Sequence, residues 1–328
     1  IRLAYYEHPD YVPLLKRAYT LWDDLAEASG QKVIHRVGGL YMGRKGHPFL
    51  EGALTSAREH GLAHEHLDAG QIRERYPMFQ VPDTHEAIFE EPAGFVVPDA
   101  VMAAHVSQAL QQGAHLRGHT RVTGWETAPS GRVTVRTAKE TYQARNLLIT
   151  AGAWTGEVLA ELGLALTVTR QTWGWFWPPD PTPFQYGAFP CWFYECPDGG
   201  GHYGFPMMPS DPGFKVAQHL PSSLSGLPEK ISREITADDE AALREFLADV
   251  IPSAHGDLLA IRTCLYTNSP DGHFIIDRHP QCERVHFACG FSGHGFKFAS
   301  VMGEVLADLA LQQQTAHPIE FLSAERFG

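Results

Sequence analysis

The feature that most constrains the fold is a strand, a glycine-rich turn and a helix near the C-terminus. Residues 285–289 form a short, largely apolar run typical of a buried strand, and residues 299–311 carry apolar side chains at helical spacing. Between them lies the sequence Gly290-Phe-Ser-Gly293-His294-Gly295-Phe296-Lys297. Glycines let a backbone approach a ligand closely, and the first N–H groups of a helix present partial positive charge. From this pattern alone, the turn is either a ligand cradle or an ordinary turn with a surface lysine.

Helix and strand patterns alternate along the rest of the chain. We expect helices over residues 9–29, 49–60, 68–76, 99–112, 155–162 and 238–250, with Asp99 as the N-cap of the fourth and Gly30 and Gly113 as stops. Strands are expected over residues 32–42, 115–127, 132–137 and 142–150, and residues 168–219 are expected to form antiparallel strands with long loops. The mixture predicts an α/β or mixed α+β protein whose domains are built from separated segments.

Charge and cysteine content exclude several classes of protein. The net charge is −12, so nucleic acid and anionic membrane surfaces are not expected as partners, and no apolar run reaches the roughly 20 residues that span a bilayer. The five cysteines include no C-x-x-C pair, which favours a reducing cytoplasm over a disulfide framework. No metal is expected, because the histidines of His64-Glu65-His66 are spaced i,i+2 and no H-E-x-x-H occurs.

Two further features are ambiguous from pattern alone. The aromatic side chains between Trp173 and Tyr203 either enclose a bulky ligand or form core, and burial tendencies favour core. Lys215 lies in the apolar run 213–217, which makes partial burial plausible. Cys264 and Tyr266 are expected on one face of a strand, but periodicity does not distinguish Cys264 from an inert buried cysteine.

Three motifs carry a family resemblance. They are Cys264-Leu-Tyr266-Thr, Asp271-x-x-Phe-Ile-Ile-Asp277 and Gly290-Phe-Ser-Gly-His-Gly-Phe-Lys297-Phe-Ala-Ser, and weaker matches are Ala151-Gly-Ala-Trp154, Tyr203-Gly-Phe-Pro206 and Phe214-Lys215. With them the chain resembles, over nearly its whole length, the monomeric sarcosine oxidase and N-methyltryptophan oxidase group of flavin amine oxidases. The resemblance implies oxidation of a secondary amino acid by hydride transfer to FAD, with O2 reduced to hydrogen peroxide.

The resemblance also implies a role for individual residues. Cys264 would bond the 8α-methyl of FAD as a thioether, Lys215 would activate oxygen, and Arg2 with Lys297 would bind the substrate carboxylate. Tyr203, Tyr266 and His219 would line the substrate cavity. The residues implied to contact FAD are Val122, Ala151, Gly152, Trp154, Gly293, His294, Gly295, Phe296 and Lys297. Without the resemblance, Arg2 would be read as a disordered terminal charge.

The resemblance divides the chain into two interleaved domains. A Rossmann-like FAD-binding domain is expected from residues 1–36, 95–168 and 270–328, and a substrate domain on an antiparallel sheet from residues 37–94 and 169–269. Family members begin with a βαβ dinucleotide-binding unit, yet this sequence contains no G-x-G-x-x-G. We therefore expect an N-terminally truncated flavin domain. We also expect that these 328 residues alone bind FAD poorly and fold poorly.

Three other functions remain open. The first is a flavin dehydrogenase that uses a different electron acceptor, and the second is a flavin-free, non-catalytic relative. A hydrolase is weakly supported, because Phe291-Ser292-Gly293-His294 does not match G-x-S-x-G. For the oxidase we expect a cytoplasmic monomer whose partners are a small secondary amino acid and O2.

Overall fold

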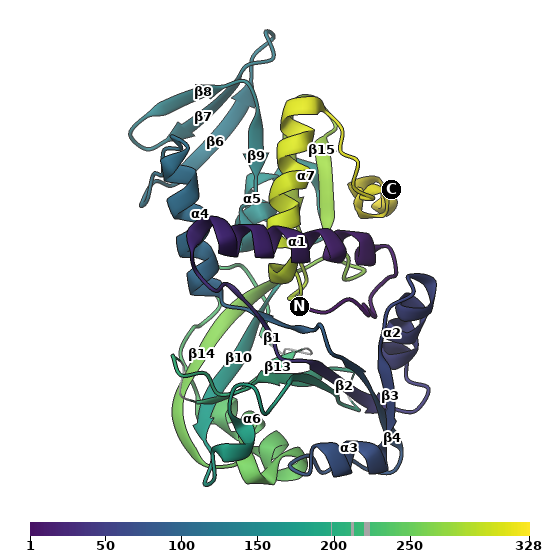
Figure 1. The fold of residues 1–328 in the computed structure, drawn as a ribbon. Helices are drawn as coiled ribbons and strands as arrows, with labels where there is room; N and C mark the ends of the chain where they lie inside the picture. The colour runs from purple at the N-terminus through teal and green to yellow at the C-terminus, as the bar shows by residue number, and fades with distance from the viewer. Residues whose placement is uncertain (198, 211–212, 220–223) are drawn as a thin grey trace. The chain divides into compact units, whose positions relative to one another are not determined.

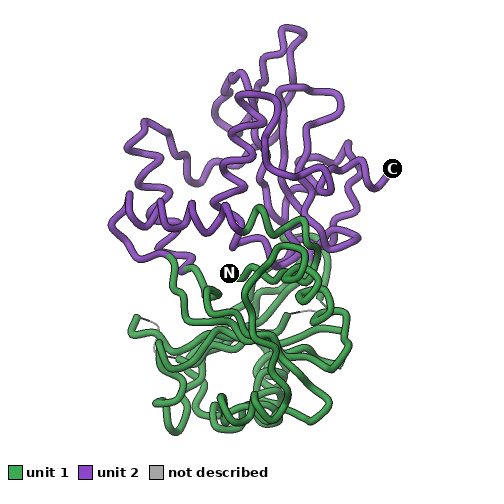
Figure 2. The backbone as a smooth tube through the Cα atoms, turned by 45° about the vertical axis from the view of Figure 1, so that its right-hand side comes forward, with its two compact units in different colours: residues 1–15, 34–96, 169–265 green, residues 16–33, 97–168, 266–328 purple. Residues whose placement is uncertain are grey.

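The chain forms two compact units, each assembled from three separate segments (Figure 2). The computed structural model describes residues 1–197, 199–210, 213–219 and 224–328. The first unit contains residues 1–15, 34–96 and 169–265, and the second contains residues 16–33, 97–168 and 266–328. These boundaries differ from the expected domain boundaries chiefly at residues 1–15, which belong to the first unit. Which unit serves which role stays a prediction.

The first unit is built on an eight-stranded sheet in the order β14-β10-β13-β12-β11-β2-β4-β3 (Figure 1). The strands are β2 (Gly39–Arg44), β3 (Glu65–Asp68), β4 (His85–Glu90), β10 (Thr167–Trp177), β11 (Cys191–Glu195), β12 (Gly201–Phe205), β13 (Phe214–His219) and β14 (Asp257–Asn268). Strand β11 pairs with β12 antiparallel and with β2 parallel. The expected antiparallel sheet therefore also contains a parallel pair.

The strand expected over residues 32–42 is two strands. Gly38 has a φ of +79°, a left-handed conformation that interrupts a strand. Before it, β1 (Ile34–Arg36) pairs only with β5 (Gly94–Val96) in a separate ribbon, and after it β2 enters the large sheet.

The large sheet buries one face in the main core of the first unit. Side chains alternate between faces along a strand, so Phe214 and Val216 point to the face opposite Lys215. There they join Trp192 and residues of α6 (Ala237–Val250) and α3 (Ala69–Arg75) in one apolar cluster. Each fully buried aromatic or aliphatic side chain of such a cluster contributes about 1.5–3 kcal/mol. At the β2–β4 end, α2 (Pro48–Glu59) packs in a second cluster that includes Tyr41 and Ile88.

Among its described residues, the second unit contains two three-stranded sheets and several helices. The sheets are β15-β16-β9 (Ile275–His279, Cys282–Cys289, Leu147–Ile149) and β6-β7-β8 (Val122–Thr127, Val133–Thr137, Thr141–Ala144). The helices are α4 (Pro98–Gln111), α5 (Thr155–Val158), α7 (Ala299–Gln312) and most of α1 (Tyr11–Ser29). Figure 1 shows α7 lying along the sheet that contains β9 and β15. None of the described helices is both long and apolar enough to cross a bilayer.

Three local predictions in this unit are wrong. Helix α4 begins at Pro98 with Val97 as its N-cap, because proline suits the first helical position and Asp99 falls inside the first turn. Residues 115–121 form no strand, since His119 adopts a φ of +52°. The expected helix over residues 155–162 is the single turn α5 followed by a 3₁₀ turn, which ends at Gly163 in the left-handed conformation.

Candidate active site

One face of the large sheet gathers the predicted site residues of the first unit. Lys215 and His219 are four positions apart on β13, and because side chains alternate between faces, both lie on the same face. Trp175 on β10 lies directly opposite Lys215, and Tyr203 on β12 lies directly opposite Ala217. Directly opposed residues share a face, so the register brings these side chains together opposite the main core. We call this surface the site face.

Aromatic rings surround the ammonium group of Lys215. Its Nζ lies 5.6 Å from the ring centroid of Trp173, 5.2 Å from that of Trp175 and 5.5 Å from that of Phe205. Lys215 is half-buried, as the apolar run around it predicted. Each ring face attracts a cation by about 0.5–2 kcal/mol, so the cage stabilises the charged form of the lysine.

Tyr203 and His219 extend the aromatic wall of the site face. Their rings meet edge-on with centroids 6.3 Å apart, and Phe193 meets the ring of His219 at 6.0 Å. By contrast, Trp192 is buried in the main core. The aromatic segment between Trp173 and Tyr203 therefore supplies both core and site face, since alternate side chains of one strand leave opposite faces.

Arg2 is buried beside the same face. Tyr41 on β2 lies directly opposite Phe193, and the guanidinium carbon of Arg2 lies 4.8 Å from the ring centroids of both Tyr41 and Tyr6. Nη2 of Arg2 also forms an ion pair with Oε2 of Glu7 at 3.6 Å. The reading of Arg2 as a disordered terminal charge is wrong, because only 9% of the residue is exposed.

The guanidinium of Arg2 is charged and retains a donor for a ligand. Burial lowers the pKa of Arg2, but the negative charge of Glu7 and the neighbouring tyrosines outweigh burial and raise that pKa overall. The Nε–H is buried and has no hydrogen-bond partner among the described residues. A buried donor without an acceptor is costly, and a carboxylate is the ligand that best satisfies a guanidinium.

Cys264 and Tyr266 lie in the same strand, β14, as the sequence predicted. Burial raises the pKa of the Cys264 thiol to about 11, although the positive charges of Arg233 and Lys215 oppose the shift. At neutral pH the free thiol is therefore almost entirely protonated. Its reaction with an electrophile would require loss of that proton.

The glycine turn of the second unit packs against Tyr266. Gly293 has a φ of +79°, and a Cβ at this position would overlap the ring of Tyr266. Gly295 caps the 3₁₀ turn Phe296–Phe298, which leads into α7, and the N–H groups of Gly295 and Phe296 take part in no hydrogen bond among the described residues. Lys297 donates from Nζ to the carbonyl of His294 at 2.8 Å. The turn thus presents backbone donors at the start of a helix, where an anion is stabilised.

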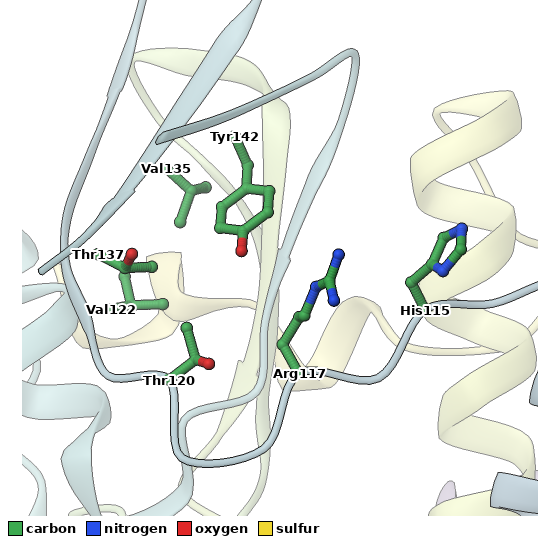
Figure 3. Close-up of a pocket in the computed structure, with 7 residues that line it drawn as sticks. All are labelled: His115, Arg117, Thr120, Val122, Val135, Thr137 and Tyr142. Carbon is green, nitrogen blue, oxygen red and sulfur yellow. The ribbon is translucent and has the colours of Figure 1, made fainter. Parts of the chain in front are cut away.

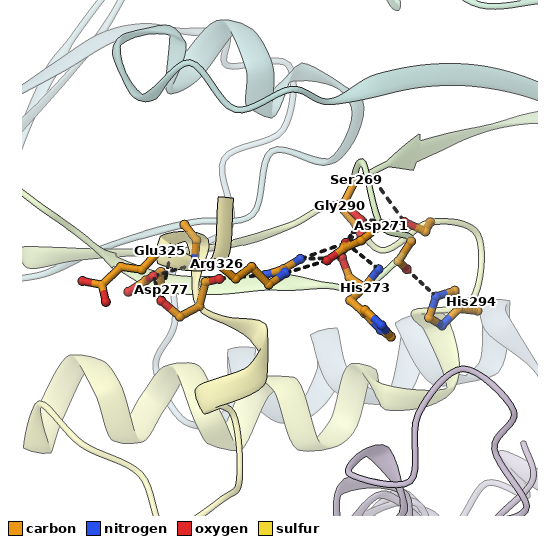
Figure 4. A network of polar contacts seen from close by, with 12 residues as sticks. Ser269, Asp271, His273, Asp277, Gly290, His294, Glu325 and Arg326 are labelled. Carbon is orange, nitrogen blue, oxygen red and sulfur yellow. Dashed lines mark hydrogen bonds and ion pairs between the residues drawn. The ribbon is translucent and has the colours of Figure 1, made fainter. Parts of the chain in front are cut away.

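A polar network anchors this turn to the C-terminal segment (Figure 4). Asp271 accepts hydrogen bonds from Nε of Arg326 at 2.8 Å and from the His273 N–H at 3.0 Å. Ser269 lies 3.3 Å from the Ser292 hydroxyl, oxygen to oxygen. Nε2 of His294 donates to the carbonyl of Gly272 at 2.9 Å. The motif 271–277 therefore holds the glycine turn.

The Asp271–Arg326 pair predicts a pH-dependent contribution to stability. Burial raises the pKa of Asp271, but the hydrogen bonds from Arg326 and the His273 N–H bring it down to about 2. Because this pKa lies below the unfolded value of about 3.9, the contribution is complete above about pH 5 and disappears as the pH falls towards 2. Arg326→Gln should therefore destabilise the protein at pH 6 and about half as much at pH 3.

Urea unfolding of Arg326→Gln and the wild type at both pH values measures this difference. Arg284→Gln, an exposed arginine of strand β16, is the control and should have little effect at either pH. An equal loss of stability in Arg326→Gln at pH 6 and pH 3 would contradict the charge interaction.

The other expected cofactor residues lie elsewhere in the second unit. Val122 lines a pocket of about 410 Å³ beside the β6-β7-β8 sheet (Figure 3). The other lining residues are His115, Arg117, Thr120, Val135, Thr137 and Tyr142. Ala151, Gly152 and Trp154 follow β9 and do not line this pocket. A Cβ at Gly152 would meet no atom within 4 Å, so the backbone there is open to close approach.

Sequence reasoning missed Glu7, Glu90 and the tryptophan cage of Lys215. Glu90 accepts hydrogen bonds from the backbone that follows Arg2. None of these residues lies in a motif, and their partners are far away in the sequence or in an irregular segment. Strand register was the only signal that could have found the tryptophans.

Comparison with known proteins identifies the class. The model of the DAO family, described as FAD dependent oxidoreductase, matches residues 1–309. Monomeric sarcosine oxidase of Streptomyces avermitilis is 40% identical over 330 residues, covering 100% of this chain and 85% of that protein. N-methyl-L-tryptophan oxidase of Yersinia pestis is 34% identical over 328 residues, covering 100% of this chain and 86% of that protein. The crystal structure of L-proline dehydrogenase from P. horikoshii has a TM-score of 0.84 at 19% identity, covering 100% of this chain and 85% of that one.

The chain therefore belongs to the DAO family of FAD-dependent oxidoreductases. Within this family it is an enzyme of the sarcosine oxidase and N-methyltryptophan oxidase type. The residues present fit such a cofactor. Gly295 and Phe296 offer two N–H donors that no described residue accepts from, which suits an anionic ring, and Cys264 offers a thiol.

Proposed function

We propose that the protein oxidises a secondary amino acid, such as sarcosine or N-methyltryptophan, with FAD bound covalently to Cys264 and O2 as the electron acceptor. The observation that carries the proposal is Arg2, a buried cation with an unused Nε–H beside the face that bears Lys215 and Tyr203. An amino acid supplies the carboxylate that this donor lacks.

Arg2 would hold the substrate by its carboxylate and orient the amine. A guanidinium and a carboxylate form charge-assisted bonds of defined direction, so Arg2 both selects amino acids over simple amines and fixes their orientation. Lys297, in the second unit, is assigned to the same carboxylate on the family resemblance alone. Tyr203, His219 and Tyr266 would line the cavity around the side chain and the N-methyl group.

When bound, FAD would supply the acceptor for a hydride from the carbon next to the amine, and O2 would take up the two electrons with two protons as hydrogen peroxide. Cys264 would hold the cofactor by a thioether, and the N–H groups of Gly295 and Phe296 would stabilise negative charge on its ring. Val122, Ala151, Gly152 and Trp154 are proposed as further contacts.

Lys215 is proposed to supply the positive charge at which O2 is reduced. Lys215→Met should lower the second-order rate of reaction with O2 by roughly 10²–10³-fold, the usual cost of removing one electrostatic stabiliser of a transition state. Stopped-flow mixing of the reduced protein with O2 measures this rate. Anaerobic reduction by substrate should change little, and Lys230→Met, an exposed lysine of the same unit, should change neither rate. A normal O2 rate in Lys215→Met would remove Lys215 from this role.

A substrate screen tests the proposed function. The purified whole protein is incubated with sarcosine, N-methyltryptophan, pipecolate or proline, and hydrogen peroxide and bound flavin are measured. The proposal expects one peroxide per substrate oxidised with at least one of them. Activity only with an artificial electron acceptor would indicate the dehydrogenase instead. Protein that carries no flavin would indicate the non-catalytic relative.

The setting proposed for this enzyme is a cytoplasmic monomer with no nucleic acid or membrane partner. The net charge of −12 and the five cysteines without a C-x-x-C pair support it. Sedimentation of the purified protein tests the oligomeric state.

A further inference from the structure

Glu90 is a buried carboxylate that the proposed reaction does not use. It is the last residue of β4 and is 1% exposed. Its Oε1 accepts hydrogen bonds from the backbone N–H of Leu3 at 3.2 Å and of Ala4 at 2.9 Å. Its Oε2 is buried and has no hydrogen-bond partner among the described residues. Burial raises the pKa of Glu90, but the N–H of Ala4 and the charge of Arg2 oppose this shift.

The bonds to Glu90 matter because the segment around Arg2 has no secondary structure. Residues 1–6 form neither helix nor strand, so their buried N–H groups find no acceptor in a regular ladder. Ala4 is fully buried, and a donor left unsatisfied there would be costly. Glu90 supplies one oxygen for two consecutive N–H groups, directly after Arg2.

A second set of bonds holds the segment on the other side of Arg2. The N–H of Gly94 donates to the carbonyl of Ile1 at 2.9 Å. Gly94 and Glu90 flank one turn between β4 and β5, so the two ends of this turn form hydrogen bonds with the backbone before and after Arg2. The direction of the Arg2 side chain is thereby set by this turn and by the aromatic rings around its guanidinium.

We propose that Glu90 is a positioning residue for Arg2: it clamps the backbone of residues 3 and 4 so that the guanidinium is held in the direction that receives the substrate carboxylate. The proposal rests on the proposed function of Arg2. It differs from a purely structural role because it predicts a loss confined to substrates that carry a carboxylate.

Steady-state kinetics of Glu90→Ala and Glu90→Gln in the whole protein test the specificity of the loss. A misplaced orienting group costs up to about 10²-fold, so Glu90→Ala should raise the KM for sarcosine by roughly 10- to 100-fold with kcat changed less than about threefold. Glu90→Gln keeps an oxygen acceptor and should lie between Glu90→Ala and the wild type. For sarcosinamide, which lacks the carboxylate, kcat/KM should be the same in all three proteins.

The matched control is Glu86→Ala. Glu86 lies on the same strand, β4, and pairs with His66 at 3.0 Å, so its loss should leave both substrates unaffected. An equal loss for sarcosine and sarcosinamide in Glu90→Gln would overturn the proposal. So would an unchanged KM for sarcosine in a folded Glu90→Ala.

Hydrogen exchange separates this proposal from the proposed function. Amide exchange of the peptide that contains Leu3 and Ala4, followed by mass spectrometry, requires no turnover. Faster exchange is expected in Glu90→Ala and not in Glu86→Ala, together with weaker binding, measured by calorimetry, of acetate, a carboxylate without an amine to oxidise. If the wild type oxidises no substrate but binds acetate, and Glu90→Ala weakens that binding, the proposed function fails and the positioning role stands. Unchanged exchange in Glu90→Ala would overturn the positioning role whatever the activity.

Discussion

Replacing Cys264 by serine is expected to convert the flavin from covalently attached to extractable by acid. A serine hydroxyl cannot form the thioether, and the remaining four cysteines lie at other positions of the chain. After acid precipitation, the yellow flavin should stay with the wild-type pellet and appear in the supernatant of Cys264→Ser. The change is all-or-none, which makes it the largest expected effect on the cofactor.

Cys282→Ser is the matched control, because Cys282 is also a partly buried free thiol in a strand. It should retain covalent flavin. Flavin that stays with the Cys264→Ser pellet would show that the attachment lies elsewhere.

The rate of attachment should also depend on pH. Because the thiol has a pKa of about 11, the reactive thiolate fraction rises about tenfold per pH unit between pH 7 and 10. Reconstitution of apoprotein with FAD at several pH values, with covalent flavin followed over time, measures this dependence. A rate that is constant over this range would indicate that a neighbouring base removes the proton first.

Replacing Arg2 by glutamine is expected to abolish most activity towards amino acids. Truncating one partner of a buried, hydrogen-bonded charge pair costs about 2–5 kcal/mol, so kcat/KM for sarcosine should fall by roughly 30- to 4000-fold. Arg2→Lys keeps the charge but loses the planar fork, and should recover part of the loss. Steady-state assays of peroxide release provide the measurement.

Arg75→Gln is a suitable control for Arg2. Its guanidinium lies 4.0 Å from the ring centroid of Phe89, but the side chain is 39% exposed and pairs with Glu65. It should therefore leave kcat/KM unchanged. Full activity of Arg2→Gln towards sarcosine would reject Arg2 as the carboxylate site.

Local sequence signals predicted much of the fold because they act over a few residues. Helices α1, α2 and α7 start and end close to the expected positions, since apolar spacing and glycine stops are properties of the segment itself. The prediction failed at residues 115–121 because of the left-handed conformation of His119, and at the start of α4 because Pro98 takes the first helical position. The break at Gly38 likewise could not be read from alternation, because the residues on both sides are strand-like.

By itself, the sequence determined the class of protein and the identity of its chemical groups. The motifs around Cys264, Asp271 and Gly293 predicted the family, and the family model confirmed it. Such motifs are readable because their residues act together within one short segment.

Only the tertiary structure decided which groups share a surface. Strand register aligns Trp175 with Lys215, and burial among tyrosines turns Arg2 from an apparent terminal charge into a buried cation. Glu90 became visible only as the acceptor for Leu3 and Ala4, 87 and 86 positions away in the sequence. Contacts across such separations depend on how strands pair and on where an irregular segment finds its hydrogen-bond partners, and neither is encoded in local spacing.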